Sequence, residues 1–311
     1  MPQVSELINI LIALTDKGIN DSNLVNHETA YYKEMMTWFA PYKNEALVLK
    51  TDSLLKKEWW KYFYLKMDAY AFNFKGNKIV KSNTYDRLNF DKAANTVEPF
   101  LKMLESFSEK TRFLLFYKNH SALYTSEIKY FKDSLDINTM QSWLNKNFPS
   151  AQYNCYKIIF SPLANGSQSA NFFSNNNFNE AHVYINFPSI DAGDKKFSAL
   201  VNKIRNGSPL FTELNHAYIN PETEKYISNE KFMVAFADLN KWETENSAAR
   251  LGYPNAFACF NEYMNWSLVS LYAMDLLPEK ELETTVSGIE KNMSEGRGFY
   301  QFKAFNRELM R

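Results

Sequence analysis

Apolar residues recur at intervals of three and four positions through most of the first half of the chain, which is the spacing of one helix face. The pattern is most regular between residues 4 and 14, and Asp16-Lys17-Gly18 follows it with a helix stop signal. A Gly-Asn turn between two short apolar runs at 74–80 favours a small hairpin. The pattern predicts helices at 4–14, 29–39, 57–72, 91–107, 112–124 and 137–148.

The pattern changes near residue 150. The segments 156–160 and 182–187 are short, rich in β-branched residues and partly alternating, which is typical of strands. The tract 164–180 between them is rich in Asn and Ser and includes Asn175-Asn176-Asn177, so we interpret it as a solvated surface loop. Helical spacing then returns and predicts helices at 196–204, 210–219, 229–250, 256–277 and 278–293.

These elements predict an α+β fold that is mostly helical. A helical N-terminal lobe would occupy residues 1–150, and residues 151–311 would form a second lobe with a small sheet and the C-terminal helices. No low-complexity linker separates the lobes, so we expect them to pack as one unit. The 311 residues include 25 Phe and 19 Tyr but only 9 Gly, a composition that favours packed helices over a Gly-rich barrel or sandwich.

Charge and hydropathy argue against two classes of partner. The chain has 35 basic and 35 acidic residues, so it lacks the net positive charge that drives binding to nucleic acid. No apolar stretch approaches the roughly 20 residues that cross a bilayer, so no transmembrane segment is predicted. The first residues lack the basic and apolar regions of a secretion signal, but a cleaved signal would leave no trace, so cytoplasm and periplasm both stay open.

The two cysteines, Cys155 and Cys259, lie far apart in the sequence and form no close pair of the kind that binds structural zinc. We interpret them as two buried thiols. A single long-range disulfide is the alternative in an oxidising compartment.

Three of the four histidines offer no evident chemistry. His27 and His120 lie in polar surroundings and are interpreted as surface residues. His182 opens a predicted strand, where a structural role is favoured because no carboxylate or cysteine stands at ligand spacing beside it. This leaves His216 as the candidate for chemistry.

His216 lies in the predicted helix 210–219, with Glu213 three residues before it and therefore on the same face. We expect Pro221 to end this helix. In metallopeptidases, H-E-x-x-H places two imidazoles one turn apart to hold zinc, and the Glu acts as general base toward the bound water. Here the segment reads T-E-L-N-H, so Thr212 takes the position of the first histidine. A neutral hydroxyl is a far poorer zinc ligand than imidazole.

Glu262 is a second candidate for a functional residue, because it interrupts a strongly apolar helical stretch where an unpaired charge would be costly. Zinc enzymes of the gluzincin type take their third ligand from a Glu on the next long helix, and the distance from His216 to Glu262 along the sequence suits that arrangement. The alternative is that Glu262 pairs with a buried Arg, Lys or Tyr.

The chain also resembles a bacterial family of uncharacterised, gluzincin-like metallopeptidases that are often exported. The resemblance covers most of the chain and rests on segments in matching order, whose central motif resembles H-E-x-x-H-x-x-x-N-P. It implies a zincin-like core, with the small sheet beside the active-site helices, and an extracytoplasmic location. It aligns Glu213 with the general base, and His216 and Glu262 with zinc ligands. These segments are 6–16, 31–33, 156–162, 211–221 and the helix around Glu262.

Two hypotheses follow from the missing first histidine. In the first, the chain is a zincin-type peptidase that cleaves a peptide or protein and tolerates Thr212 through a replacement ligand or another metal. In the second, it is a pseudopeptidase that binds peptide or glycan in the remnant cleft. A separate carbohydrate-binding module ranks lower, because the aromatic residues spread over the whole chain. The replacement ligands considered are Asp238, Glu243 and Glu245, and the expected cleft lining is Tyr218, Tyr263 and Trp266.

Overall fold

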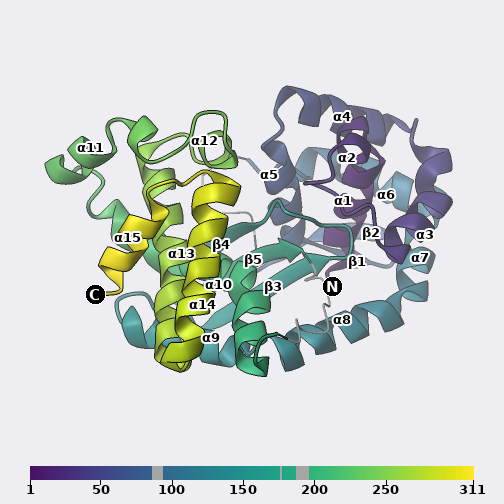
Figure 1. Cartoon of the computed structure of the whole chain (residues 1–311). Coiled ribbons are helices and arrows are strands. Elements are labelled where there is room, and N and C mark those ends of the chain that lie inside the picture. The colour runs from purple at the N-terminus through teal and green to yellow at the C-terminus, as the bar shows by residue number, and fades with distance from the viewer. Residues whose placement is uncertain (86–93, 176, 187–195) are drawn as a thin grey trace. The chain divides into compact units, whose positions relative to one another are not determined.

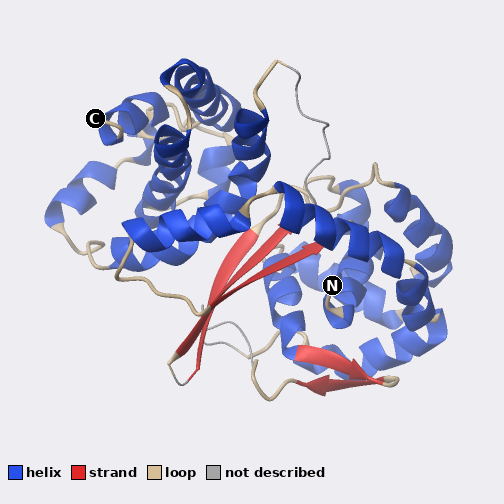
Figure 2. Ribbon diagram, turned by 90° about the horizontal axis from the view of Figure 1, so that it is seen from below, coloured by secondary structure: helices blue, strands red, loops and turns tan. Residues whose placement is uncertain are grey.

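The computed structural model describes residues 1–85, 94–175, 177–186 and 196–311, which form an α+β fold made mostly of helices (Figures 1 and 2). The chain divides into two compact units. The first contains residues 1–131 and 153–189, and the second contains 132–152 and 190–311. The small sheet therefore groups with the N-terminal helices, so the compact units do not follow the expected division at residue 150. None of the helices in these ranges is long and apolar enough to cross a membrane.

The first unit combines helices with a two-stranded and a three-stranded sheet. Its helices are α1 (Gln3–Leu14), α2 (Asp16–Asn20), α3 (Ala30–Phe39), α4 (Ala46–Lys57), α5 (Lys61–Asp68), α6 (Leu101–Thr111), α7 (Phe113–Asn119) and α8 (Ser121–Ser134), whose last residues enter the second unit. Its 3-10 turns are η1 (Ala40–Tyr42), η2 (Ala69–Ala71) and η3 (Glu98–Phe100). Its strands are β1 (Phe72–Lys75), β2 (Lys78–Lys81), β3 (Cys155–Ser161), β4 (Ser169–Asn175) and β5 (Phe178–Asn186).

Helix α1 forms the centre of the first unit. Most of its residues are buried around its whole circumference, as expected for a helix that is apolar on every side. Glu6 is an acidic residue among these apolar ones, yet its side chain is buried as well. The Tyr31 hydroxyl donates to Glu6 Oε1 at 2.6 Å, and the Tyr124 hydroxyl lies 2.6 Å from that of Tyr31. Burial raises the pKa of Glu6 to about 7.

The hairpin predicted at 74–80 is confirmed as β1 and β2, with Gly76 at φ +60° in the turn. The helix predicted at 57–72 is shorter than expected. Helix α5 ends at Asp68, whose carboxylate accepts a hydrogen bond from the Thr96 backbone N–H at 2.6 Å. A turn of 3-10 helix, η2, then leads directly into β1. Phe72, which the helical pattern assigned to the predicted helix, is the first residue of this strand.

The three-stranded sheet has the order β3-β5-β4, with β3 parallel and β4 antiparallel to β5. The loop interpretation of 164–180 is wrong, because this tract contains β4 and a tight hairpin that holds Asn177 at φ +67°. Pairing with β5 satisfies the backbone of this polar segment, and Asn tolerates the left-handed turn. Asn176, residue 187 of the second predicted strand and residues 91–93 of the predicted helix 91–107 lie outside the described residues.

The second unit is helical throughout the residues that the structure describes. Helix α10 runs from Ala199 to Glu224 and merges the two helices predicted at 196–204 and 210–219. The expectation that Pro221 ends the helix is wrong, because Pro209 and Pro221 both lie inside it and each removes only one backbone donor.

The helix predicted at 229–250 breaks into three short pieces. The remaining elements are α9 (Ile137–Asn147), α11 (Glu230–Phe236), η4 (Leu239–Lys241), α12 (Ala248–Gly252), α13 (Ala256–Leu276), α14 (Glu279–Lys291), the π-helical turn η5 (Asn292–Arg297) and α15 (Phe302–Leu309).

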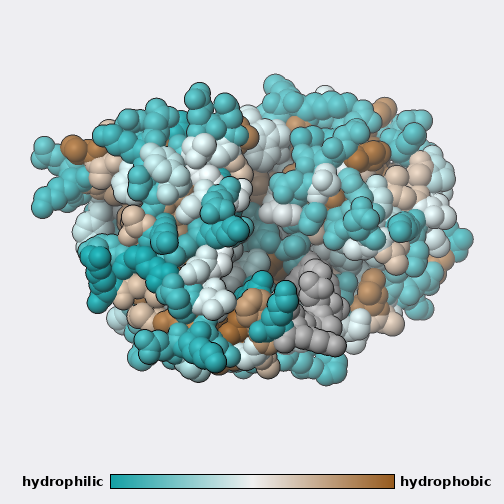
Figure 3. Space-filling model, viewed as in Figure 1, coloured by the Kyte–Doolittle hydropathy of each residue, from teal (hydrophilic) through white to brown (hydrophobic). Residues whose placement is uncertain are grey.

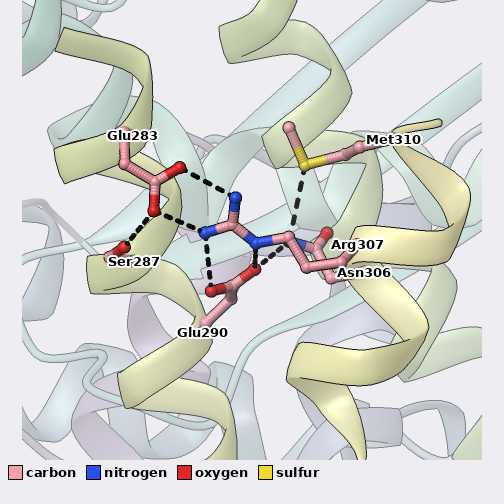
Figure 4. A network of polar contacts seen from close by, with 6 residues as sticks. All are labelled: Glu283, Ser287, Glu290, Asn306, Arg307 and Met310. Carbon is pink, nitrogen blue, oxygen red and sulfur yellow. Dashed lines mark hydrogen bonds and ion pairs between the residues drawn. The ribbon is translucent and has the colours of Figure 1, made fainter. Parts of the chain in front are cut away.

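Helix α15 is fixed to α14 by one arginine, which Figure 4 shows between two glutamates. Arg307 Nε lies 2.5 Å from Glu290 Oε1, and its two terminal nitrogens lie 2.8 and 2.9 Å from the carboxylate of Glu283. Asn306 donates to the same Glu290 oxygen at 3.1 Å. The Arg307 hydrogen bonds lower the pKa of Glu283 to about 2. The C-terminal helix is therefore held by a bidentate contact with one exposed carboxylate and by a second contact with a buried one.

The surface of both units is mainly hydrophilic on the face seen in Figure 3, with hydrophobic side chains scattered among polar ones. Scattered exposed apolar residues are normal for folded proteins and indicate no partner by themselves. Both cysteines are free thiols, Cys259 buried and Cys155 half-buried.

Candidate functional site

Helices α10 and α13 pack together and bring His216 beside Asn265. The Asn265 amide nitrogen lies 2.9 Å from His216 Nδ1 and 3.2 Å from Nε2, and Asn220 Oδ1 lies 3.2 Å from Nδ1. The Asn220 oxygen can only accept and the Asn265 nitrogen can only donate, so the tautomer of His216 decides which of the two contacts at Nδ1 is a hydrogen bond. The imidazole of His216 is therefore held between two amide side chains.

Glu262 lies one helical turn before Asn265 and is almost fully buried. Its Oε1 is 2.6 Å from Arg297 Nη1 and accepts a hydrogen bond from Trp266 Nε1 at 3.0 Å. The alternative that Glu262 pairs with a basic side chain is therefore observed, although Arg297 is half-buried and not fully buried. Because a carboxylate in an apolar helix needs a partner of opposite charge, this ion pair explains how α13 tolerates Glu262.

Arg297 is enclosed by aromatic rings as well as by its ion pair. Its guanidinium carbon lies 5.6 Å from the ring centres of Tyr253 and Trp266 and 5.3 Å from that of Phe299. Nη2 donates to the Tyr253 hydroxyl at 3.0 Å. Burial raises the pKa of Tyr253, and the charge of Glu262 raises it further, so this hydroxyl stays protonated.

The backbone that carries Arg297 depends on Gly298. Arg297 is the last residue of η5, and Gly298 caps it at φ +89°, a conformation that residues with a Cβ rarely adopt. A Cβ at this position would overlap the side chain of Ser247, and the Gly298 carbonyl accepts from the Thr244 N–H at 2.8 Å. The position of the guanidinium is therefore set by a turn that only glycine fits.

We expect Gly298→Ala to lower the free energy of unfolding by about 2 kcal/mol, from the left-handed backbone and the clash with Ser247. Urea denaturation followed by circular dichroism measures this change. Gly288→Ala is the matched control, because this position lies inside α14 with open space around its Cα, and alanine there should stabilise by up to about 1 kcal/mol. Equal effects of the two substitutions would contradict the special role of Gly298.

The other two residues of the motif lie on α10. Thr212 is buried, and its hydroxyl donates to the Pro209 carbonyl at 2.9 Å. Glu213 is half-buried, and its charge adds to that of Glu262 in raising the pKa of the Tyr253 hydroxyl. Arg297 thus contacts the Tyr253 hydroxyl directly, and the charges of Glu262 and Glu213 act on it from farther away.

The expected replacement ligands do not join this cluster. Glu243 is buried and bonds Arg250 Nε at 2.9 Å, Asp238 caps η4, and Glu245 is exposed. Among the described residues, no three side chains of His, Cys, Asp or Glu stand close enough to share a metal ion.

Two of the three residues expected to line a cleft belong to the core instead. Tyr218 is fully buried and donates to Asn145 Oδ1 at 2.7 Å, and Tyr263 is fully buried and donates to the Trp242 carbonyl at 2.6 Å. Only Trp266 is partly accessible. Helical spacing cannot distinguish a ring that lines a cleft from a ring that fills the core, and here the rings of Tyr218 and Tyr263 fill the core.

Residues 5–309 match one family, described as a domain of unknown function (DUF4932). The chain belongs to this family. No curated protein and no solved structure matches it. The description of DUF4932 names no activity.

Sequence reasoning missed Arg297, Asn265 and Tyr253 in this DUF4932 chain. The one available signal was the buried charge of Glu262, which required a cation. With 35 Lys and Arg residues in the chain, no spacing rule singled out Arg297.

The other histidines also differ from expectation. His27 and His120 are half-buried, His27 bonding the Gly18 carbonyl and His120 bonding the Phe116 carbonyl and Glu34. His182 does have a carboxylate beside it. Its Nε2 lies 3.1 Å from Glu180 Oε2, because residues two apart on a strand share one face.

Proposed function

We propose that this chain is a non-catalytic relative of gluzincin-type metallopeptidases, and that it binds peptides without hydrolysing them. The proposal rests on the 2.6 Å ion pair between Glu262 and Arg297. In a gluzincin the corresponding carboxylate gives its negative charge to zinc. Here a guanidinium takes that charge, and a second cation bound to the same carboxylate would be repelled by it.

The remaining donors fit zinc no better. Thr212 offers a hydroxyl that is already bonded to the helix backbone, and the Asn265 amide nitrogen lies within 3.2 Å of both ring nitrogens of His216. A catalytic zinc site normally has three protein ligands and one open position. The donor set of this chain therefore does not fit the ion, and Glu213 has no metal-bound water on which to act as a base.

The surroundings of Arg297 suit a peptide. Its side chain keeps 24% of its accessible surface, and it lies among the rings of Tyr253, Trp266 and Phe299. A guanidinium carries five N–H donors, so those that Glu262, Tyr253 and the Met293 sulfur leave over can bond backbone carbonyl oxygens. We favour peptide over glycan because carbonyl oxygens are the stronger acceptors and the partly accessible ring of Trp266 adds apolar contact.

Metal content tests the first half of the proposal. The wild type, Thr212→His, and Thr212→His with Arg297→Met are expressed in zinc-supplemented medium without an affinity metal and compared by elemental analysis. We expect well under one zinc per chain in the first two and about one in the double variant, where a third ligand is restored and the repelling cation is removed. About one zinc in the wild type, lost in His216→Ala, would overturn the proposal.

Peptide binding tests the second half. Fluorescein-labelled tryptic peptides of casein serve as the probe, and fluorescence polarisation measures binding in the presence of EDTA. We expect saturable binding to the wild type that is at least tenfold weaker in Trp266→Ala and unchanged in Trp60→Ala, an exposed tryptophan in the other unit. Cleavage of the same peptides in a parallel incubation with zinc and without EDTA, or equal binding by both variants, would contradict a non-catalytic peptide-binding site around Arg297.

A further inference from the structure

Helix α4 of the first unit has an exposed face that is basic and apolar. The other side of this helix packs against α1 and α2 (Figure 1), and the one acidic residue of the helix, Asp52, is buried on that side. Because the buried and exposed positions follow the period of the helix, the exposed positions form one continuous face. None of them is a carboxylate. They are Ala46, Leu49, Lys50, Ser53, Lys56 and Lys57.

Two lysines of this face are available to a partner. Lys50 and Lys57 are seven residues apart, close to two full turns, so they lie on the same side of the helix. Within the described part of the chain neither forms an ion pair. Lys56 differs, because its Nζ lies 2.5 Å from Asp52 and 2.8 Å from Asp16. The positive charge that the face offers to a partner therefore comes from Lys50 and Lys57.

Two consecutive tryptophans follow the basic face. Trp59 and Trp60 lie in the turn between α4 and α5, where they keep 48% and 46% of their accessible surface. All six tryptophans are among the described residues, and only these two are exposed. The turn does not depend on them for its position, because the buried Tyr62 anchors α5 and donates to the Leu24 carbonyl at 3.0 Å. Adjacent exposed rings beside the exposed Leu49 indicate a surface that a partner covers.

The chemistry of this surface fits an anionic bilayer. Tryptophan prefers the interface between membrane and water, because its ring is apolar and its N–H is polar. Lysines near that interface are attracted to anionic headgroups, and the burial of apolar side chains adds to the attraction. Binding to nucleic acid depends mainly on many basic residues, whereas this face offers two. Leu49 is 55% exposed and has no flat ring on which a base could stack.

We propose that the exposed face of α4, together with Trp59 and Trp60, is a docking surface for an anionic lipid bilayer. The two rings enter the headgroup region, and Lys50 and Lys57 pair with lipid phosphates and carboxylates. The chain then lies on the membrane surface. The balanced charge of the whole chain does not prevent this, because charges farther away than a Debye length of about 8 Å are largely screened. The surface belongs to the first unit and does not depend on the peptide-binding proposal for the second.

Vesicle co-sedimentation of the full chain tests the docking surface. The vesicles contain phosphatidylcholine alone, or phosphatidylcholine with about one-third phosphatidylserine. We expect binding to the anionic vesicles that weakens from about 0.1 to about 1 M NaCl, because the Debye length falls from about 10 to about 3 Å. On anionic vesicles with brominated acyl chains, the bound protein should lose part of its tryptophan fluorescence, since bromine quenches rings that enter the bilayer.

Two double variants locate the binding. Trp59→Ala with Trp60→Ala, and Lys50→Glu with Lys57→Glu, should each bind at least tenfold more weakly. The first should also lose the quenching by bromine. The matched controls remove exposed side chains of the same kinds from the second unit and should bind as the wild type does. These controls are Tyr226→Ala with Ile227→Ala, and Lys231→Glu with Lys241→Glu.

Four results would overturn the proposal. One is no binding of the wild type to anionic vesicles at about 0.1 M salt, and another is binding that both double variants leave unchanged. Equal binding to neutral and anionic vesicles would contradict the role of the lysines. Binding of oligodeoxythymidine without binding of vesicles would assign the face to single-stranded nucleic acid. Circular dichroism verifies that each variant is folded, as expected for substitutions at exposed positions.

Discussion

Replacing Arg297 by methionine is expected to lower the free energy of unfolding by about 3–5 kcal/mol, the largest effect of any single substitution considered. The cause is the carboxylate left behind. Glu262 is almost fully buried, and without Arg297 its remaining partner is the Trp266 N–H at 3.0 Å. A buried charge that loses its counter-ion costs more than the ion pair itself contributes.

A double-mutant cycle separates the ion pair from the packing of the arginine. Glu262→Gln with Arg297→Met should recover most of the loss, because no charge is then left unpaired. Arg311→Met, at the exposed C-terminal arginine, controls for the removal of one positive charge and should change stability by less than about 0.5 kcal/mol. Urea denaturation of each variant gives the values, and additive effects of the two single substitutions would contradict a coupled pair.

The second large effect concerns the pH dependence that Glu6 gives the first unit. Burial raises the pKa of this carboxyl from 4.5 to about 7. A carboxyl whose pKa is raised by folding stabilises the protein below its unfolded pKa and loses that contribution as the pH rises through the folded value. The protein therefore loses this stability between pH 4.5 and about pH 7. The pKa shift corresponds to about 3 kcal/mol in the free energy of unfolding.

Glu6→Gln should remove most of this dependence. The amide keeps the shape and an oxygen that accepts from Tyr31, but it never takes on a charge inside the core. We expect the wild type to lose stability between about pH 5 and about pH 8, and the variant to be up to about 3 kcal/mol more stable at the upper end. Burial and the charge of Glu6 both raise the pKa of the nearby Glu127, to about 8, so the variant should also ease the ionisation of Glu127.

Urea denaturation at several pH values, with the exposed Glu308→Gln as control, measures this difference. A wild type whose stability rises from pH 5 to pH 8 would contradict the buried, protonated state of Glu6, because it has the opposite sign.

Several elements of this protein could be predicted from local pattern alone. The central helix α1, the hairpin at Gly76 and the long helix α13 follow from the spacing of apolar residues and from one turn signal. The same reading identified Glu262 as a charge in need of a partner. These inferences succeed because they concern neighbouring residues on one element, whose relation is fixed by the period of the helix or strand.

The sequence by itself thus determined a mostly helical α+β chain, with the candidate residues Glu213 and His216 on one helix and Glu262 on another. Only the tertiary structure decided that Arg297 neutralises Glu262, and that β4 pairs with β5 where a loop was expected. Each of these pairings joins residues whose separation in the sequence follows no period. The packing of elements that are far apart in the sequence decides which residue pairs with a buried charge or amide. A buried group without a partner costs free energy, whatever the sequence distance to the residue that could pair with it.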